Sequence, residues 1–452
     1  MVIIERFKLL RFNLSPTQVL VLGFAFIIIV GALLLNLPIA SKSGQSVGFL
    51  NALFTATSAV CVTGLVVVDT FDTYSLFGQI VIISLIQIGG LGIMTMATLI
   101  FLLLGKKITF KERLIIQEAL NQISVAGVVR LTKFILMGTF LFELLGAFFL
   151  SFRFIPQFGL KKGIYYSLFH SISAFNNAGF DLMGGFRSLT QYVEDPIVSL
   201  TISALIVIGG LGFSVWADIY TKRCFRKLSL HTKLVIVITA FLIITGAVMF
   251  YILEYNNPAT MGNLSMKGKV LSAVFHSITP RTAGFNTLST ADMTMASKFL
   301  TVILMFIGGS PGGTAGGIKT VTFGIIILAV FAVIRGKDEP EIFKKRIPNS
   351  IVYRSLGIMI ISLSIVVAGL MVLSITEKAD FLMILYEVVS AFGTVGLTLG
   401  LTPHLTVIGK IVIILTMYMG RVGPLTVATA LAQRESSRKE LLRYPEEKVM
   451  VG

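Results

Sequence analysis

Apolar residues in this chain form long runs that are separated by polar loops and by much shorter apolar runs. Each long run can cross a hydrocarbon core about 30 Å thick as a single helix. The pattern therefore predicts eight membrane spans, near residues 17–38, 76–104, 133–152, 196–217, 233–253, 299–334, 351–375 and 405–432.

The long runs form four successive pairs, and one short apolar run lies between the two members of each pair. The short runs are residues 51–60, 164–175, 270–279 and 382–392. These runs are about half the length that a crossing needs, so they predict re-entrant or interfacial helices. Backbone that leaves a helix at membrane depth needs protein or water around it. We therefore expect the four short helices to surround one shared aqueous lumen.

A segment with one glycine follows each short run: VCVTGL (60–65), FNNAGF (175–180), PRTAGF (280–285) and FGTVGL (392–397). The glycines are 115, 105 and 112 residues apart, which indicates an internal repeat over nearly the whole chain. The predicted units are residues 1–105, 106–220, 221–335 and 336–434, followed by a tail, 435–452. The predicted fold is an all-α polytopic membrane protein with four parallel span/pore-helix/span repeats around a pseudo-fourfold pore.

Composition agrees with a membrane protein, because 55% of the residues are hydrophobic, 13% are charged and the mean hydropathy is +0.89. The net charge of +16 does not indicate nucleic-acid binding, since the basic residues gather on alternate loops. Such loops face the cytoplasm in membrane proteins. We expect a multi-pass protein of the cell membrane with both termini cytoplasmic. The basic clusters lie at 6–11, 105–113, 221–233, 335–354 and 434–448.

The glycine segments have the chemistry of a cation filter. A short helix that descends from the outer surface directs its partly negative C-terminal end to the membrane centre. A glycine there permits positive φ, so that carbonyl oxygens turn inward and replace an ion's hydration shell. Glycines that only ease helix packing are the alternative. The predicted potassium filter comprises Val62, Thr63, Gly64, Asn177, Ala178, Gly179, Thr282, Ala283, Gly284, Thr394, Val395 and Gly396.

A glycine pair recurs 24–30 residues after each filter glycine, starting at Gly89, Gly209, Gly308 and Gly420. In the first two repeats we expect close helix packing or a helix bend. The third, GGSPGGTAGGIKT (308–320), cannot continue as a straight helix, so we predict an intramembrane loop that gates the lumen. A hinge without ion contact is the alternative. The predicted gate residues are Gly312, Gly313, Thr314, Ala315, Gly316, Gly317, Lys319 and Arg421.

Arg421 replaces the second glycine of the fourth pair, and an arginine among apolar residues should face the bundle interior. We favour an electrostatic barrier to cations over an anchor that binds helix-end carbonyl groups. Asp69 and Asp181 follow filter glycines, where they either concentrate cations or are ordinary loop acids.

Catalysis is not expected. His170, His276 and Glu387 occupy comparable places in different repeats, so symmetry should keep them apart. No cluster of Cys and His predicts a transition-metal site, and Cys61 and Cys224 should lie at different depths without a disulfide. A membrane-embedded enzyme is thus the least favoured class.

Together these features resemble the Trk/Ktr/HKT superfamily of potassium transporters, and more closely its KtrB-type bacterial subunit. The resemblance covers nearly the whole chain and rests on the four glycine segments, the GGTAGG loop and the arginine of the last span. It implies potassium uptake through a channel-like pore, with the loop at 308–318 below the filter and Arg421 nearby. Four filter glycines, without a serine in the first position, are associated in the family with potassium permeation.

Two features depart from the expected pattern. No segment contains the full TVGYG of tetrameric potassium channels, so looser selection of potassium over sodium is expected. The third repeat is one residue shorter between His276 and Gly284 than the second is between His170 and Gly179, which leaves its local register open.

The resemblance also implies partners: a homodimer of pore subunits on a cytosolic, nucleotide-binding ring of the KtrA type, in addition to membrane lipid. No cofactor is expected on this chain, and nucleotide is expected on the ring. The connector at 335–349 is a hypothetical docking site, through Lys344, Lys345 and Arg346. An alternative function is secondary transport of potassium coupled to sodium or protons. Parallel repeats favour the channel-like pore.

Overall fold

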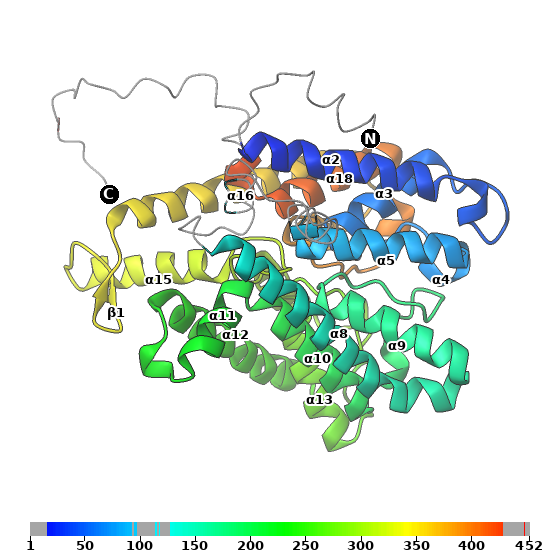
Figure 1. Ribbon diagram of the computed structural model, residues 1–452, viewed down its shortest axis with the longest axis horizontal. Helices are drawn as coiled ribbons and strands as arrows, with labels where there is room; N and C mark the ends of the chain where they lie inside the picture. The colour runs from blue at the N-terminus through cyan, green and yellow to red at the C-terminus, as the bar shows by residue number, and fades with distance from the viewer. Residues whose placement is uncertain are drawn as a thin grey trace.

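The computed structural model describes residues 16–92, 95, 96, 114, 117, 127–427 and 447. The predictions about the N-terminal basic residues, most of the 97–130 connection and nearly all of the tail fall outside these residues. Within them the chain is helical apart from connecting segments and one small hairpin (Figure 1).

Four groups of helices follow one another along the chain, each with a first span, a short helix and a second span that pack together. The first group is α2(Pro16–Leu35), α3(Phe49–Val60) and α5(Leu76–Leu91), with η1(Pro38–Ala40) and α4(Thr70–Thr73) between them. The second is α8(Val128–Phe158), α9(Leu160–Phe175), η2(Thr190–Tyr192), α10(Pro196–Gly210) and α11(Phe213–Lys222), followed by η3(Phe225–Lys227). The third is α12(Leu230–Glu254), α13(Met266–Ile278), α14(Met295–Phe306) and α15(Thr320–Ile334). The fourth is α16(Asn349–Thr376), α17(Phe381–Gly393), η4(Thr402–His404) and α18(Val407–Val422).

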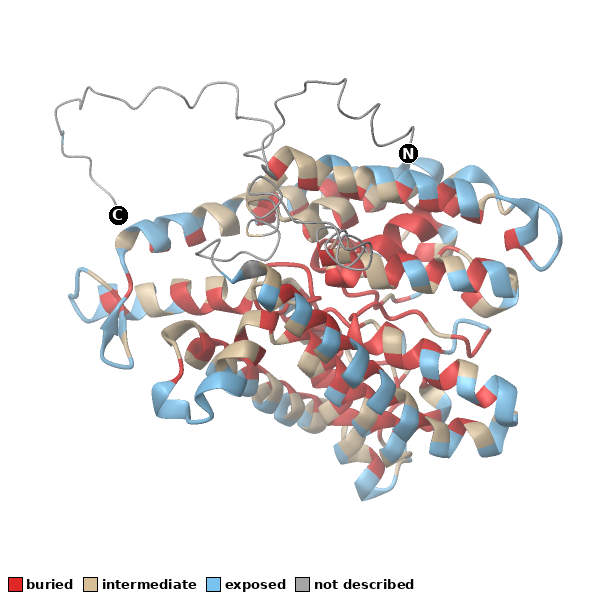
Figure 2. Ribbon diagram, in the orientation of Figure 1, coloured by how far each residue is buried: buried red, intermediate tan, exposed pale blue. Residues whose placement is uncertain are grey.

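The four groups are joined in a closed ring. The second span of each group packs against the short helix of the next: α5 on α9, α10 on α13, α14 on α17 and α18 on α3. Figure 2 shows that buried residues concentrate where the short helices and the segments after them meet, at the centre of the molecule. The four short helices confirm the predicted ones, although α9 and α13 begin four residues earlier than expected.

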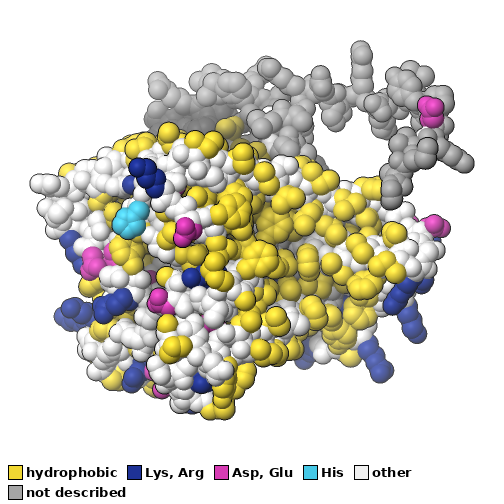
Figure 3. All heavy atoms as spheres, turned by 180° about the vertical axis from the view of Figure 1, so that it is seen from behind, with side chains coloured by type: hydrophobic (Ala, Val, Ile, Leu, Met, Phe, Trp, Pro, Cys, Tyr) yellow, Lys and Arg dark blue, Asp and Glu magenta, His cyan; other side chains and the backbone are white. Residues whose placement is uncertain are grey.

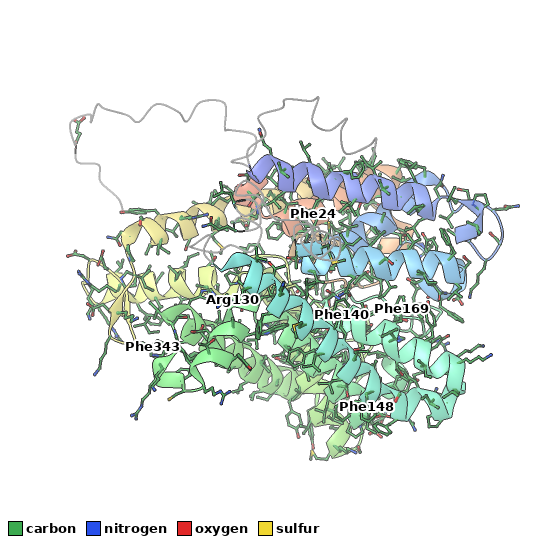
Figure 4. All side chains as sticks on the ribbon, in the orientation of Figure 1. Phe24, Arg130, Phe140, Phe148, Phe169 and Phe343 are labelled. Atoms are coloured by element: carbon green, nitrogen blue, oxygen red, sulfur yellow. The ribbon has the colours of Figure 1, made fainter. Side chains whose placement is uncertain are left out.

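The outer surface is apolar, as a membrane protein requires. Figure 3 shows a wide hydrophobic area across one face, with charged side chains gathered at its two ends. On α8, Phe140 and Phe148 stand on the outside with 45% and 56% of their surface exposed, whereas Phe24 and Phe169 are buried between helices (Figure 4). Among the described residues, the first span of every group is long and apolar enough to cross a membrane: Thr17–Leu35, Val129–Phe158, Leu230–Glu254 and Asn349–Thr376.

The second spans predicted at 76–104, 196–217 and 405–432 do not continue as single straight helices; a bend was one of the two expectations for the first two repeats, whereas none was expected in the fourth. Each breaks at the last glycine of its repeated motif, because Gly92, Gly212 and Gly423 have φ of +83°, +96° and +97°, which a helix cannot contain. At Gly212 the axis turns by 93° between α10 and α11. The third break, between α14 and α15, was predicted and is a 13-residue segment, 307–319.

The second spans begin at side-chain caps. Asp195, Ser75, Thr294 and Thr406 each accept a hydrogen bond from a backbone N–H in the first turn. In the third and fourth groups a glutamate at the end of the first span repeats one arrangement: the Glu254 carboxylate accepts from the N–H and hydroxyl of Thr294, and Glu377 does so from Thr406. The equivalent contacts support the internal repeat.

The connector between α15 and α16 contains a hairpin, β1(Glu341–Ile342) and β2(Lys345–Arg346), which the all-helical prediction missed. Its two turn residues, Phe343 and Lys344, both have positive φ, as a type I′ turn needs. Neither is a residue type that signals such a turn, so the hairpin has no clear signature in the sequence.

Candidate functional site

The four filter glycines meet in one ring. Their φ values are +91° at Gly64, +69° at Gly179, +78° at Gly284 and +91° at Gly396. A Cβ atom added to any one of them would lie no farther than 2.7 Å from a carbonyl oxygen of the next segment. These oxygens belong to the residues that precede the next glycines: Ala178, Ala283, Val395 and Thr63. Four carbonyl oxygens and four glycines therefore alternate around the ring, and no side chain fits at the glycine positions.

The predicted filter residues share one backbone conformation. Two residues before each glycine lies a residue with positive φ that is not glycine: Val62, Asn177, Thr282 and Thr394, at +50°, +58°, +68° and +51°. Such values are rare for β-branched side chains such as valine and threonine. Strain of this kind persists only where surrounding packing imposes it, and it gathers at functional sites.

A side-chain hydroxyl group forms a hydrogen bond with the backbone of each filter segment. The N–H groups of Gly64 and Gly396 donate to the hydroxyl oxygens of Ser58 and Ser390, both at 3.1 Å. In the second and third segments the hydroxyl of Ser173 or Thr279 instead donates to a carbonyl oxygen just after the glycine, at 2.7 and 2.5 Å. Because α13 ends at Ile278, Thr279 supports its segment although it precedes its glycine by five residues instead of six. The shorter third repeat thus keeps its glycine in the ring.

A cavity of about 360 Å³ opens from the ring towards the loops that follow the filter segments, and all four filter glycines line it. Asp69, Asp181 and Arg187 line it as well. Asp69 caps α4 and accepts a hydrogen bond from the N–H of Phe186, and Asp181 accepts one from Met183. Both acids therefore have structural partners, and both line the cavity.

The predicted gate loop lies against the filter segments. Thr314 donates from its hydroxyl to the Asn177 side-chain oxygen at 2.8 Å, and from its N–H to the Gly209 carbonyl at 3.2 Å. Gly316 and Gly317 approach Thr394 and Gly393 of the fourth segment so closely that added Cβ atoms would contact them. The N–H of Phe213 donates to the Gly312 carbonyl, and Gly313 lies beside the Gly212 backbone, which joins the loop to the α10–α11 break.

Two cationic side chains hold the loop. The Arg421 guanidinium donates to the carbonyl oxygens of Thr314, Gly89 and Gly90, and the Lys319 ammonium donates to that of Ala315 at 2.6 Å. These are the contacts of the anchor that we ranked second for Arg421. The part-buried guanidinium keeps its charge in the anchored position, so the barrier interpretation stays a prediction.

The first glycine of each repeated pair allows a close approach to another part of the backbone. The sequence predicted close packing there but not the partners. Added Cβ atoms at Gly89, Gly209 and Gly420 would collide with the carbonyl oxygens of Val60, Phe175 and Phe392, at or next to the last residues of the short helices. Close helix packing is therefore confirmed in the first two repeats and extends to the fourth. In the third, Gly308 lies instead against the Gly316 carbonyl of the loop.

The polar residues on the short helices do not converge. Thr55, His170, His276 and Glu387 hold equivalent places, and each bonds to a residue that follows its own filter segment. Their partners are Tyr74, Leu182, Thr301, and Thr398 with Thr402. Each side chain thus binds the chain that follows its own filter segment, in agreement with the rejection of a catalytic set. Cys61 is buried, Cys224 is exposed and both are free thiols, as predicted.

The sequence is similar to known transport proteins over its whole length. It matches the family described as "TrkH: Cation transport protein" over residues 16–440. It is 48% identical to the Ktr system potassium uptake protein B of Bacillus subtilis, with 98% of each chain covered. It is 44% identical to the potassium/sodium uptake protein NtpJ of Enterococcus hirae, with 98% of this chain and 99% of that one covered.

The fold is similar to that of a solved structure, the crystal structure of the potassium transporter TrkH from Vibrio parahaemolyticus. The TM-score is 0.72, with 93% of this chain and 86% of that chain covered, at 18% sequence identity. Family, sequence relatives and fold agree with the resemblance inferred from the glycine segments. This multi-pass membrane protein belongs to the TrkH cation transport family, as a KtrB-like member of the Trk/Ktr superfamily, which is a family of transporters and not of enzymes.

Proposed function

We propose that this protein takes up potassium through a channel-like pore whose filter is the ring of carbonyl oxygens and glycines. The ring is the observation that carries the proposal, since four inward segments around one axis offer oxygen dipoles in place of water. The four short helices add the partly negative charge of their C-terminal ends, which favours cations. Relatives named as potassium uptake proteins support potassium as the ion.

The loop at 312–317 is the proposed gate. In the closed arrangement the carbonyl oxygens of Thr314 and Ala315 are occupied by Arg421 and Lys319. A cation that leaves the filter then meets two positive charges and no free oxygen from these residues. Anchor and barrier are thus two effects of one arrangement, and movement of the loop removes both.

The neck of the loop, residues 307–309 and 318–320, is held by backbone contacts within the third group, so the tip can move without it. Ile307 and Ile318 pair side by side, the Gly308 N–H donates to the Ile318 carbonyl at 2.8 Å, and the Thr320 N–H donates to Gly309 at 3.0 Å. By contrast, the tip at 312–317 is bound mainly to other groups of helices. Because the neck continues directly into α15, a displacement of α15 would pull the loop away from those contacts.

Regulation is proposed to come from outside the chain. The name "Ktr system" of the relatives implies a membrane subunit that works with others. We propose a homodimer on a cytosolic nucleotide-binding ring of the KtrA type, with both termini of this chain on the cytoplasmic side. Ion-coupled secondary transport is the second candidate, because one relative is named for potassium and sodium together.

The first test is flux of potassium, rubidium and sodium into liposomes that contain this chain alone, with and without residues 312–317. We expect potassium-selective flux that rises on deletion, since deletion removes the Thr314 contacts but keeps the 307–318 neck. Flux that needs a sodium or proton gradient would favour the coupled transporter. Correctly folded protein without cation flux in either form would exclude the pore, and flux unchanged by deletion would exclude the gate.

A further inference from the structure

Glu143 is a buried acid that neither the filter nor the gate uses. It lies at the midpoint of α8, the first span of the second group, and only 3% of its surface is exposed. The ion pairs among the described residues are Arg153 with Asp195, Lys222 with Asp218, Lys337 with Glu341 and Arg346 with Glu339, and none includes Glu143. An unpaired carboxylate at membrane depth is costly.

The carboxyl group lies in a polar cluster in which one amide nitrogen faces three oxygen atoms. The Asn176 side-chain nitrogen lies 3.0 Å from the Glu143 Oε1, 2.9 Å from the Gln87 Oε1 and 2.9 Å from the Ile172 carbonyl oxygen. An amide nitrogen donates only two hydrogens. If the Asn176 amide were turned over, its oxygen would face these oxygens with no hydrogen of its own. In either orientation the Asn176 amide leaves at least one of these three oxygens without a hydrogen.

The helix end makes a negative charge still less favourable at this place. Asn176 caps the C-terminal end of α9, where the helix dipole is negative. The Arg421 side chain is engaged with the carbonyl oxygens of Gly89, Gly90 and Thr314. Among the described residues no cation pairs with Glu143, and a proton would neutralise the carboxylate.

We propose that Glu143 is a neutral, protonated carboxylic acid that positions the second filter segment. Its O–H group adds a hydrogen that the Asn176 amide cannot supply, and the cluster then holds Asn176 between α5, α8 and α9. The fit is tight, because a Cβ atom added at Gly90 would collide with the Asn176 side chain. Asn176 directly precedes Asn177, the residue with φ of +58° that begins the filter backbone and binds Thr314. The selectivity part of this proposal rests on the proposed filter, whereas the protonation does not.

Infrared spectroscopy of the full chain in liposomes tests the protonation. Wild-type protein at neutral pH should show the carbonyl band of a protonated carboxylic acid, and the E143Q variant should lack that component. Buried Glu387 is present in both proteins, so the difference isolates Glu143. A difference confined to the carboxylate bands would show that Glu143 is ionised and would overturn the proposal.

Flux measurements on the same proteins test the positioning. Glutamine keeps a neutral group of the same size, so E143Q should keep the potassium-over-sodium flux ratio within about twofold, whereas E143A should lower it roughly tenfold. Loss of selectivity in E143Q equal to that in E143A, or wild-type selectivity in both, contradicts the positioning role. If E143A does not assemble, the ratio in E143Q and the infrared band decide. Absence of flux in wild-type protein would count against the pore, while the infrared result would still judge Glu143.

Discussion

At the scale of single residues, glycine has two different tasks in this protein. The filter glycines have positive φ and also face a neighbouring carbonyl oxygen, so they satisfy a conformational and a steric requirement together. Gly89, Gly209 and Gly420 are helical and satisfy only the steric one, against the ends of the short helices. The sequence marks both sets by their repeat spacing, and only the neighbours in the structure separate the two tasks.

Gly64→Ala tests the steric task at the filter. Its Cβ would lie 2.5 Å from the Ala178 carbonyl oxygen, so we expect strongly reduced potassium flux and a lower potassium-over-sodium ratio. The matched control is Gly48→Ala, in the same repeat, where φ is +84° and nothing lies within 4 Å of an added Cβ. Positive φ alone should cost each variant about 1–2 kcal/mol of stability. Equal flux in the two variants would contradict the assignment of Gly64 to the filter.

At the scale of elements, the second span of every repeat is interrupted. Each interruption contributes a different group to the contacts around the loop. The first and fourth supply carbonyl oxygens and Arg421, the second supplies the bend at Gly212, and the third supplies the loop that joins them. The loop therefore depends on three other elements for its position. Loss of one contact should loosen the closed arrangement without unfolding the ring.

Arg421→Gln and Arg421→Lys distinguish the two interpretations of this side chain. A hydrogen bond to a charged group contributes about 1.5–3 kcal/mol, so loss of the guanidinium in R421Q should raise resting flux roughly tenfold or more. Lysine keeps the charge but not the fork that reaches both Thr314 and Gly89. If anchoring dominates, R421K should resemble R421Q in liposome flux. If the barrier dominates, R421K should resemble the wild type. Wild-type flux in both variants would remove Arg421 from the gate.

At the scale of the whole molecule, four groups of helices close into one ring while the outer face stays apolar. The connector hairpin projects beyond α15, directly continuous with the helix that follows the gate loop (Figure 1). It is fixed to the α11–α12 connection, since the Phe343 ring lies 6.2 Å from that of Phe225 and the Lys233 ammonium lies 5.8 Å from the Phe343 ring. A partner bound at the hairpin could therefore act on the loop through α15, the single helix between them.

Replacing Lys344, Lys345 and Arg346 by glutamine tests this docking site. We expect weaker co-purification with the cytosolic ring and loss of nucleotide control, with basal flux of the isolated chain unchanged. Arg346 pairs with Glu339 and is 74% exposed, so the cost in stability should be small. The control replaces Lys161, Lys162 and Lys267, three exposed cations near the starts of two short helices. Unchanged binding in the first triple variant would put the contact elsewhere.

The sequence alone determined the four first spans, the four short helices, the glycine segments and the interrupted third repeat. These features depend on local quantities: the length of an apolar run, and the backbone conformations that glycine and proline permit. It also indicated the family, because the spacing of those local features is unusual. Only the tertiary structure decided which groups meet: Thr314 with Asn177, Arg421 with Gly89, and Asn176 with Gln87. Each of these contacts joins different repeats, so it exists only after the ring closes, and no periodicity along one segment can encode it. The structure also decided how far the second repeat bends: the axis turns by 93° between α10 and α11, where the N–H of Phe213 donates to the Gly312 carbonyl of the third repeat, a contact that no local pattern encodes.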